Sequence, residues 1–177
     1  MAIQQELELT FPAQRVTQPI LSRMAREHDV VFNIASANVS HARGHFHLTL
    51  LGEDAAVKDA ERFLRDAGVE VKAIKSVPYA GQVPPRPKRQ QGAPGEEVVS
   101  RKLWITYMDD FRRGPATWEM ACTFDVTFDV RQSSTGPSVS IMAMLLEGPR
   151  SQVEGAIEFL RRHGAEVEPI EKSVIEG

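Results

Sequence analysis

The chain has 177 residues, of which 42% are hydrophobic and 25% are charged, and its net charge is −3. Such a composition fits one medium-sized globular domain or two small ones, without the excess of Lys and Arg that marks nucleic-acid-binding domains. No apolar run approaches the roughly 20 residues of a membrane-spanning helix, the first residues do not resemble a signal peptide, and Cys122 has no partner for an internal disulfide. We therefore expect a cytoplasmic protein with neither nucleic acid nor a membrane as its partner.

The first part of the chain, residues 1–76, alternates between the patterns of strands and helices. Apolar residues at every second position, as in Leu7, Leu9 and Phe11, are typical of a half-buried strand. We expect Asp54 to cap the second helix and Gly68 to end it. The predicted elements are a strand over 7–11, a helix over 20–28, strands over 30–34 and 46–50, a helix over 54–67 and a strand over 69–71.

Residues 77–97 form a segment that holds five of the chain's eleven prolines. Proline fixes φ and removes a backbone donor, so neither a helix nor a central strand is expected here. The composition predicts an extended, mobile linker whose basic residues Arg86, Lys88 and Arg89 lie in solvent. The alternative is that these three residues bind an acidic surface or the groove of a partner.

The second part, residues 98–177, repeats the first with an offset of 96 residues and no gap. This period is much longer than the units of solenoid proteins, so we interpret it as the duplication of a whole small domain. By the same offset, Ser151 is expected to cap the second helix of the second copy. The matched pairs include Leu7 and Leu103, Met24 and Met120, Phe32 and Phe128, Leu50 and Leu146, Phe63 and Phe159, and Gly68 and Gly164.

The element order βαββαβ in each part predicts an α+β chain of two tandem ferredoxin-like domains, 1–76 and 98–177, with the linker 77–97 between them. In each domain, two helices would cover one face of a four-stranded antiparallel sheet and leave the other face bare. The two sheets would pack on each other, pair edge to edge, or meet a second chain in a homodimer. The apolar residues expected to point outward, and so to form an interface, are Val31, Ala35, Ala37, Trp104, Met108, Ile141, Ala143 and Leu145.

A family resemblance lies in residues 19–39. The helix PILSRMAREH followed by the strand VVFNIASANV is similar to the NIL domain, and the resemblance covers about residues 5–76 and, more weakly, 101–171. The NIL domain is a βαββαβ fold related to ACT regulatory domains. It is found at the C-terminus of the ATPase subunit of bacterial methionine-import ABC transporters and is fused to some ferredoxins. In the transporter it dimerises and binds methionine, which inhibits import.

The resemblance also implies a position for ligand contact. The family name echoes Asn-Ile-Leu, whereas residues 33–35 read Asn-Ile-Ala and residues 129–131 read Asp-Val-Arg. By position, Asn33 is the implied ligand contact, with Ser36 and Asn38 beside it, and Asp129 puts an equivalent second site in doubt. An amide side chain offers both a donor and an acceptor to an amino acid. The alternative for Asn33 is a hydrogen bond to the neighbouring repeat.

Three histidines, His41, His45 and His47, lie around the predicted hairpin of the first part. The last two are two positions apart and so project from one face of a strand, a spacing that metal sites use. The alternative is that they are exposed or lie at an interface. We expect no other metal ligands and no cofactor.

The sequence holds no phosphate-binding loop and no triad motif. We therefore expect a protein that is not an enzyme. The favoured hypothesis is a bacterial regulatory protein that binds a small amino acid, methionine or a related sulfur compound. The alternatives are a ligand-free module that docks on a transporter or an enzyme of sulfur metabolism, and a metal sensor that uses His41, His45 and His47.

Overall fold

The computed structural model describes residues 1–16, 18–108 and 115–170. The short helix α1 was not expected from the sequence, whereas the other elements of the first half, residues 1–78, occur in the predicted order. These elements are β1 (Ala2–Pro12), α1 (Ala13–Val16), α2 (Ile20–Glu27), β2 (Val31–Val39), β3 (Arg43–Glu53), α3 (Asp54–Asp66) and β4 (Glu70–Pro78).

The second half, residues 98–170, repeats the bounds of the strands and long helices at the same offset of 96 residues, except that β8 is shorter than β4; the positions equivalent to α1 lie outside the described residues. The register repeats as well: Ala2 pairs with Glu53, and Val98 pairs with Pro149. The elements are β5 (Val98–Met108), α5 (Ala116–Thr123), β6 (Thr127–Thr135), β7 (Val139–Pro149), α6 (Arg150–Arg162) and β8 (Glu166–Pro169).

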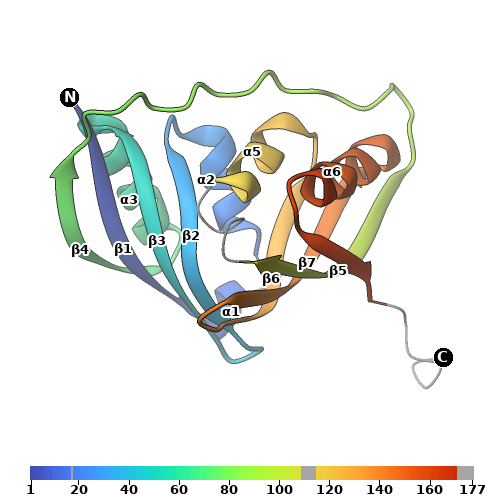
Figure 1. The fold of residues 1–177 in the computed structure, drawn as a ribbon, viewed down its shortest axis with the longest axis horizontal. Coiled ribbons are helices and arrows are strands. Elements are labelled where there is room, and N and C mark those ends of the chain that lie inside the picture. The colour runs from blue at the N-terminus through green and yellow to red at the C-terminus, as the bar shows by residue number, and fades with distance from the viewer. Residues whose placement is uncertain (17, 109–114, 171–177) are drawn as a thin grey trace.

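The described strands form one antiparallel sheet in the order β4-β1-β3-β2-β6-β7-β5-β8 (Figure 1). The sequence predicted a four-stranded sheet in each half, whereas the structure has a single sheet that runs through both halves. The halves join edge to edge, because β2 and β6 pair at Val39 and Ser133. Of the three arrangements that the sequence left open, the structure has edge-to-edge pairing.

One face of the sheet is covered by helices. Along β1, buried residues such as Leu7 and Leu9 alternate with half-buried ones, since successive side chains point to opposite faces. The buried set packs against Val57 and Leu64 of α3 in a hydrophobic core that runs through both halves. The other face carries the partly exposed residues. Among the described helices, none has the length and apolar character needed to cross a bilayer.

A β-bulge interrupts the pairing of β2 with β3 between Ile34 and Ser36. The extra residue, Ala35, is exposed, and it reverses the alternation that follows it. Ala37 consequently lies opposite Phe46 and is buried in the core. The prediction that Ala37 points outward is thus wrong, because it assumed an unbroken strand.

The C-terminal ends of the long helices α3 and α6 agree with the sequence prediction, whereas their N-terminal ends do not. Gly68 and Gly164 have φ values of 92° and 97°, which confirms them as the left-handed residues that end α3 and α6. Asp54 and Ser151 do not cap these helices, because β3 and β7 run directly into them and the N-cap residues are Glu53 and Pro149. Instead, the N–H and hydroxyl of Ser151 donate to the carboxylate of Glu96, which lies before β5.

The segment between β4 and β5 runs past the ends of α2 and α5 (Figure 1). It is anchored there, since the N–H of Gln90 donates to the carbonyl of Thr123 at 2.7 Å. Lys88 is exposed as predicted, but Arg86 and Arg89 donate to backbone carbonyls of the two helices. The prediction that these two arginines simply lie in solvent is wrong, because the last carbonyls of a helix lack intrahelical donors and attract such groups.

Candidate functional site

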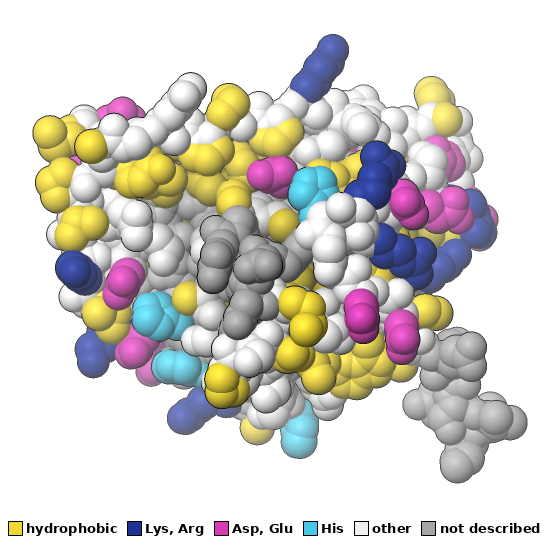
Figure 2. Space-filling view, viewed as in Figure 1, with side chains coloured by type: hydrophobic (Ala, Val, Ile, Leu, Met, Phe, Trp, Pro, Cys, Tyr) yellow, Lys and Arg dark blue, Asp and Glu magenta, His cyan; other side chains and the backbone are white. Residues whose placement is uncertain are grey.

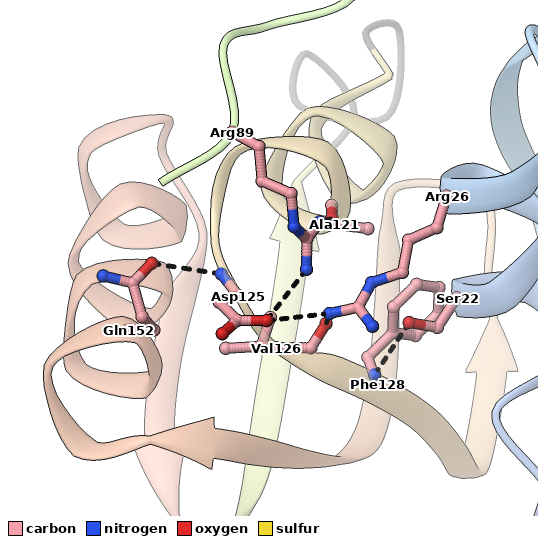
Figure 3. A network of polar contacts seen from close by, with 8 residues as sticks. All are labelled: Ser22, Arg26, Arg89, Ala121, Asp125, Val126, Phe128 and Gln152. Carbon is pink, nitrogen blue, oxygen red and sulfur yellow. Dashed lines mark hydrogen bonds and ion pairs between the residues drawn. The ribbon is translucent and has the colours of Figure 1, made fainter. Parts of the chain in front are cut away.

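The junction between the halves is a short strand pairing completed by side chains of α2. Within the described residues, β2 and β6 pair only at Val39 and Ser133. Toward the start of β6, the N–H of Phe128 donates to the hydroxyl of Ser22 at 3.3 Å, and Arg26 donates at 3.0 Å to the carbonyl of Val126, the residue before the strand (Figure 3). Side chains from one half therefore satisfy backbone groups of the other half where the strands no longer pair.

A small pocket lies beside this junction and takes its lining from both halves. Its volume is about 20 Å³, enough for about one water molecule. Most of the lining is apolar, with Gln18 and Asp129 as the polar members. The lining residues are Phe11, Gln18, Ile20, Leu21, Val39, Gly44, Phe46, Phe128, Asp129 and Val130.

Asp129 is the ionisable residue of this lining, and its side chain is only 7% exposed. Nε of Arg131, the bulge residue of β6, lies 2.9 Å from its Oδ2, but neither atom has a well-oriented hydrogen-bond partner among the described residues. Burial raises the pKa of Asp129 to about 6, with Arg131 opposing the shift. Asp129 pairs with Leu145, so its carboxyl group points to the uncovered face of the sheet, whereas its neighbours Phe128 and Val130 point to the core and line the pocket. A carboxyl group that changes its charge near pH 6 thus lies across the strand from the pocket.

The residues that the resemblance implied, Asn33, Ser36 and Asn38, lie on the face of β2 that the helices leave uncovered. The bulge at Ala35 brings all three onto this one face. Asn33 and Ser36 are half-buried and Asn38 is exposed, and none of them lines the pocket at the junction. Their role in ligand contact stays a prediction. Their partners on β3 are, in order, Thr49, His47 and His45.

Asn33 and Asp129 occupy the same position in the two halves. Asn33 precedes the bulge of β2, and Asp129 precedes the matching bulge of β6 between Val130 and Gln132. The sequence offset showed this equivalence, but not that Asp129 is buried next to a pocket. Burial at that place depends on the junction of the halves, for which the sequence carries no local signal.

Residues 5–73 match the family model of the NIL domain. The first half of the chain contains a NIL domain. The match runs from β1 into β4 and so includes the seven pocket residues of the first half. The other three pocket residues, Phe128, Asp129 and Val130, lie outside it.

Curated relatives of the NIL domain are named as components of methionine import. The chain is 29% identical over 73 residues to methionine import ATP-binding protein MetN 2 of Listeria innocua, and equally identical to the protein of the same name from Listeria monocytogenes. Each alignment covers 39% of this chain and 22% of the relative. The chain thus spans about a fifth of the length of these relatives.

Solved structures with similar chains are more distant. A protein described as unknown from Galdieria sulphuraria is 10% identical, with 98% of this chain and 100% of that chain covered and a TM-score of 0.33. Aminoacylhistidine dipeptidase from Vibrio alginolyticus is 16% identical, with 96% of this chain and 39% of that chain covered and a TM-score of 0.39.

Outside the NIL domain, the uncovered face of the second half carries large apolar side chains. Trp104, Met108 and Ile141 are 38%, 49% and 43% exposed, as the sequence predicted for outward positions. Leu145 is half-buried, and Ala143 is buried although it lies opposite Trp104. Their service as an interface stays a prediction.

In the NIL domain itself, Val31 lies on the outward face as expected, but its side chain is buried. Val31 pairs with Leu51 and therefore lies on the face opposite Leu50, yet only 6% of Val31 is exposed. The expectation of an exposed apolar residue here is wrong. Ala35, which is exposed in the bulge, retains the predicted accessibility.

The histidines of the NIL domain have separate partners. Nδ1 of His45 lies 3.3 Å from the hydroxyl of Thr10, and Nε2 of His47 lies 3.7 Å from a carboxylate oxygen of Glu6, whereas His41 lies in the exposed turn. Within the described part of the chain, no group of three His, Cys, Asp or Glu side chains is placed to hold a metal ion. In the view of Figure 2, histidine, acidic and basic side chains are interspersed rather than gathered by type.

Proposed function

We propose that this protein is a non-catalytic regulatory protein that binds a small apolar amino acid, such as methionine, at the junction of its halves. The NIL domain and its relatives named for methionine import support the ligand class. The matching bounds and register support the view that the second half is a second, diverged NIL-like domain with a ferredoxin-like, ACT-like fold. In this proposal the protein acts in the cytoplasm.

The single observation that carries the proposal is the pocket that both halves line where the pairing of β2 and β6 ends. A strand edge beyond the end of a ladder offers backbone donors and acceptors to a ligand. In this proposal the apolar lining receives the side chain of the amino acid, and ionised Asp129, on the other face of the same strand, adds a negative potential that favours the ammonium group. One short chain thereby supplies an interface that the resemblance attributes to a dimer.

The present size of the pocket has a consequence for binding. A cavity of about 20 Å³ holds one water molecule, so a side chain as long as that of methionine enters only if the lining moves apart. Ligand binding would then select a wider form of the junction, and the shift in population would be the regulatory signal. This step follows from the proposed site and needs no second binding site.

Isothermal titration calorimetry with L-methionine, L-leucine and glycine tests the proposal. Saturable heat for the two apolar amino acids, but not for glycine, is the expected result, since glycine brings no apolar side chain. Asp129→Asn should weaken binding at pH 7.5 by removing the charge next to the pocket. The absence of heat for the whole panel, with a folded protein, would count against amino-acid binding.

Asn33→Ala is the matched variant in the first half. Because Asn33 does not line the pocket, we expect this variant to bind like the wild type. Loss of binding in Asn33→Ala with retention in Asp129→Asn would move the site to the uncovered face of β2, and so would overturn the junction site while leaving amino-acid binding intact.

The exposed apolar face of the second half favours a second candidate function, a docking module for a transporter or an enzyme of sulfur metabolism. Trp104, Met108 and Ile141 are too exposed to be part of the core. In that case no amino acid releases heat, and the substitution Trp104→Lys abolishes co-purification of a partner that the wild type retains. Co-purification unchanged in Trp104→Lys would contradict this function.

A further inference from the structure

The segment between the halves places two arginines at equivalent helix ends. Nη1 of Arg86 donates to the carbonyl of Ala25 at 2.8 Å, and Nη1 of Arg89 donates to the carbonyl of Ala121 at 3.3 Å. Ala25 and Ala121 are separated by the 96-residue offset of the repeat. The segment therefore passes from the first half to the second between Arg86 and Arg89. The hydrogen bonds to Ala25 and Ala121 hold the two guanidinium groups in place.

A third arginine joins them from α2. Nη2 of Arg26 and Nη2 of Arg89 lie 3.4 Å and 3.0 Å from the same oxygen of Asp125 (Figure 3). In the described ion pairs, the carboxylate of Asp125 has only these two cationic partners. The N–H of Asp125 donates to the side-chain oxygen of Gln152. Two guanidinium groups thus share one carboxylate oxygen, and the third, that of Arg86, lines the same cavity, in a chain whose overall charge is −3.

The excess of positive charge arises from a difference between the repeats. The residue equivalent to Arg26 in the second half is Cys122, a buried thiol that lines the same cavity. Burial raises the pKa of Cys122, which keeps the thiol uncharged. Cys122 therefore adds no negative charge to balance the arginines.

The cavity between these groups has room for a ligand. Its volume is about 400 Å³, and Arg26, Arg86, Pro87, Arg89, Cys122 and Asp125 line it. Nε of Arg26 is buried and has no hydrogen-bond partner among the described residues, which is unusual for a charged donor. Burial and the charge of Arg89 lower the pKa of Arg26, so an added anion would relieve an existing repulsion.

We propose that this cavity is a binding site for a small oxyanion, namely a phosphate or sulfate group, free or carried by a small molecule. Guanidinium groups present planar pairs of donors that match the oxygens of such a group. Arg86 and Arg89 are already held by helix carbonyls, so binding immobilises few side chains. This site is separate from the pocket at the junction and does not depend on the proposed amino-acid ligand.

The test is a titration with inorganic phosphate, in which sodium chloride keeps the ionic strength constant. Two-dimensional NMR monitors the Nε–H resonances of the arginines during the titration. We expect a saturable shift of the Arg26 resonance that chloride does not produce. A parallel titration with glycerol 3-phosphate distinguishes a site for free phosphate from one that prefers an esterified phosphate group.

Arg26→Lys and Arg89→Lys should each weaken phosphate binding at least fivefold, because each replaces a planar pair of donors by a single ammonium. Arg62→Lys is the matched control, since Arg62 is an exposed residue of α3 paired with Asp59, and its binding should equal that of the wild type. Arg89→Lys lies outside the helices and strands, so it remains informative if Arg26→Lys does not fold.

Equal responses to phosphate and chloride, or equal affinities in Arg89→Lys and Arg62→Lys, would overturn the proposal. The variant Asp129→Asn separates the two sites of this protein. It should bind phosphate like the wild type whether or not amino-acid binding at the junction is lost.

Discussion

The ionisation of Asp129 links one residue to the stability of the protein. The pKa of this buried carboxyl is raised to about 6, so the folded protein holds a proton that the unfolded chain releases near pH 4. A raised pKa in the folded state means that stability falls as the pH rises from about 4 to above 6. At neutral pH the charge of Asp129 therefore opposes folding.

Asp129→Asn removes this titration and restores the amide found at the equivalent position, Asn33. We expect the variant to raise the free energy of unfolding at pH 7.5 by about 2 kcal/mol more than at pH 4, since each pKa unit corresponds to about 1.4 kcal/mol. Urea denaturation at both pH values measures the difference. An identical gain or loss at both values would show that Asp129 titrates normally.

Ser22 is a second residue whose contribution crosses the junction. It is fully buried, and its hydroxyl accepts the N–H of Phe128 from the other half. Ser22→Ala leaves that N–H without its partner, and we expect a loss of about 1–2 kcal/mol of stability. Ser100→Ala, at an exposed position of β5, is the control and should change stability by less than about 0.5 kcal/mol. Equal effects of the two substitutions would contradict the role of Ser22.

At the scale of single residues, the sequence predicted which residues are equivalent in the two halves, but it did not predict which residues contact each other across the junction. The offset of 96 residues aligned Asn33 with Asp129, and the structure places both just before a bulge. The burial of Asp129, Ser22 and Arg26 depends on the other half of the chain. Such contacts leave no periodic pattern in the sequence, which is why the pocket and the arginine cluster were not predicted.

Among the elements, helix α6 shows how a segment outside the helices stabilises a helix end. The carboxylate of Glu96 accepts hydrogen bonds from the N–H and hydroxyl of Ser151 in the first turn of α6, and these bonds lower the pKa of Glu96. A lowered pKa means that this stabilisation is present at neutral pH and is lost as the pH falls through the lowered pKa of Glu96.

Glu96→Ala should lower the melting temperature, because the first N–H groups of a helix have no other partner. Glu97→Ala is the matched neighbour, since it loses only an exposed ion pair with Arg150. Differential scanning calorimetry at pH 7 should show the larger decrease for Glu96→Ala. A decrease for Glu97→Ala that is equal or larger would assign the stabilisation to the ion pair.

The elements themselves were largely predictable. Alternation and helical spacing predicted the strands and long helices, and Gly68 and Gly164 marked the helix ends because a left-handed residue favours glycine. The bulge after Ile34 was not predicted, since one extra residue in a strand changes the face of Ala37 without changing its surroundings in sequence. The predicted N-cap of α3, Asp54, was wrong by one residue, because β3 continues to Glu53 and Glu53 is the N-cap.

At the scale of the whole molecule, the two halves share a sheet and a core, and we expect them to unfold together. Trp104 and Trp118 both lie in the second half, so tryptophan fluorescence reports on that half, whereas far-ultraviolet circular dichroism reports on the whole chain. Coincident urea transitions by the two signals are the expected result. A separate transition in the circular dichroism alone would show that the halves unfold independently.

The sequence predicted two domains but left their arrangement open. Each half completes a four-stranded pattern of its own with two edge strands, so the sequence does not show that the edges of β2 and β6 are the ones that meet. Their pairing is short, at Val39 and Ser133, and beyond it Ser22 and Arg26 bond the N–H of Phe128 and the carbonyl of Val126. A junction made this way is closed by a few contacts, which suits a site that must widen to bind a ligand.

The most direct test of the central claim is the effect of L-methionine on the backbone amide resonances of the two strands at the junction. Binding at a site shared by both halves predicts that Val39 of the NIL domain and Val130 of the second half shift together and saturate at one methionine concentration. Shifts confined to one half, or no saturable shift in either strand, would contradict it.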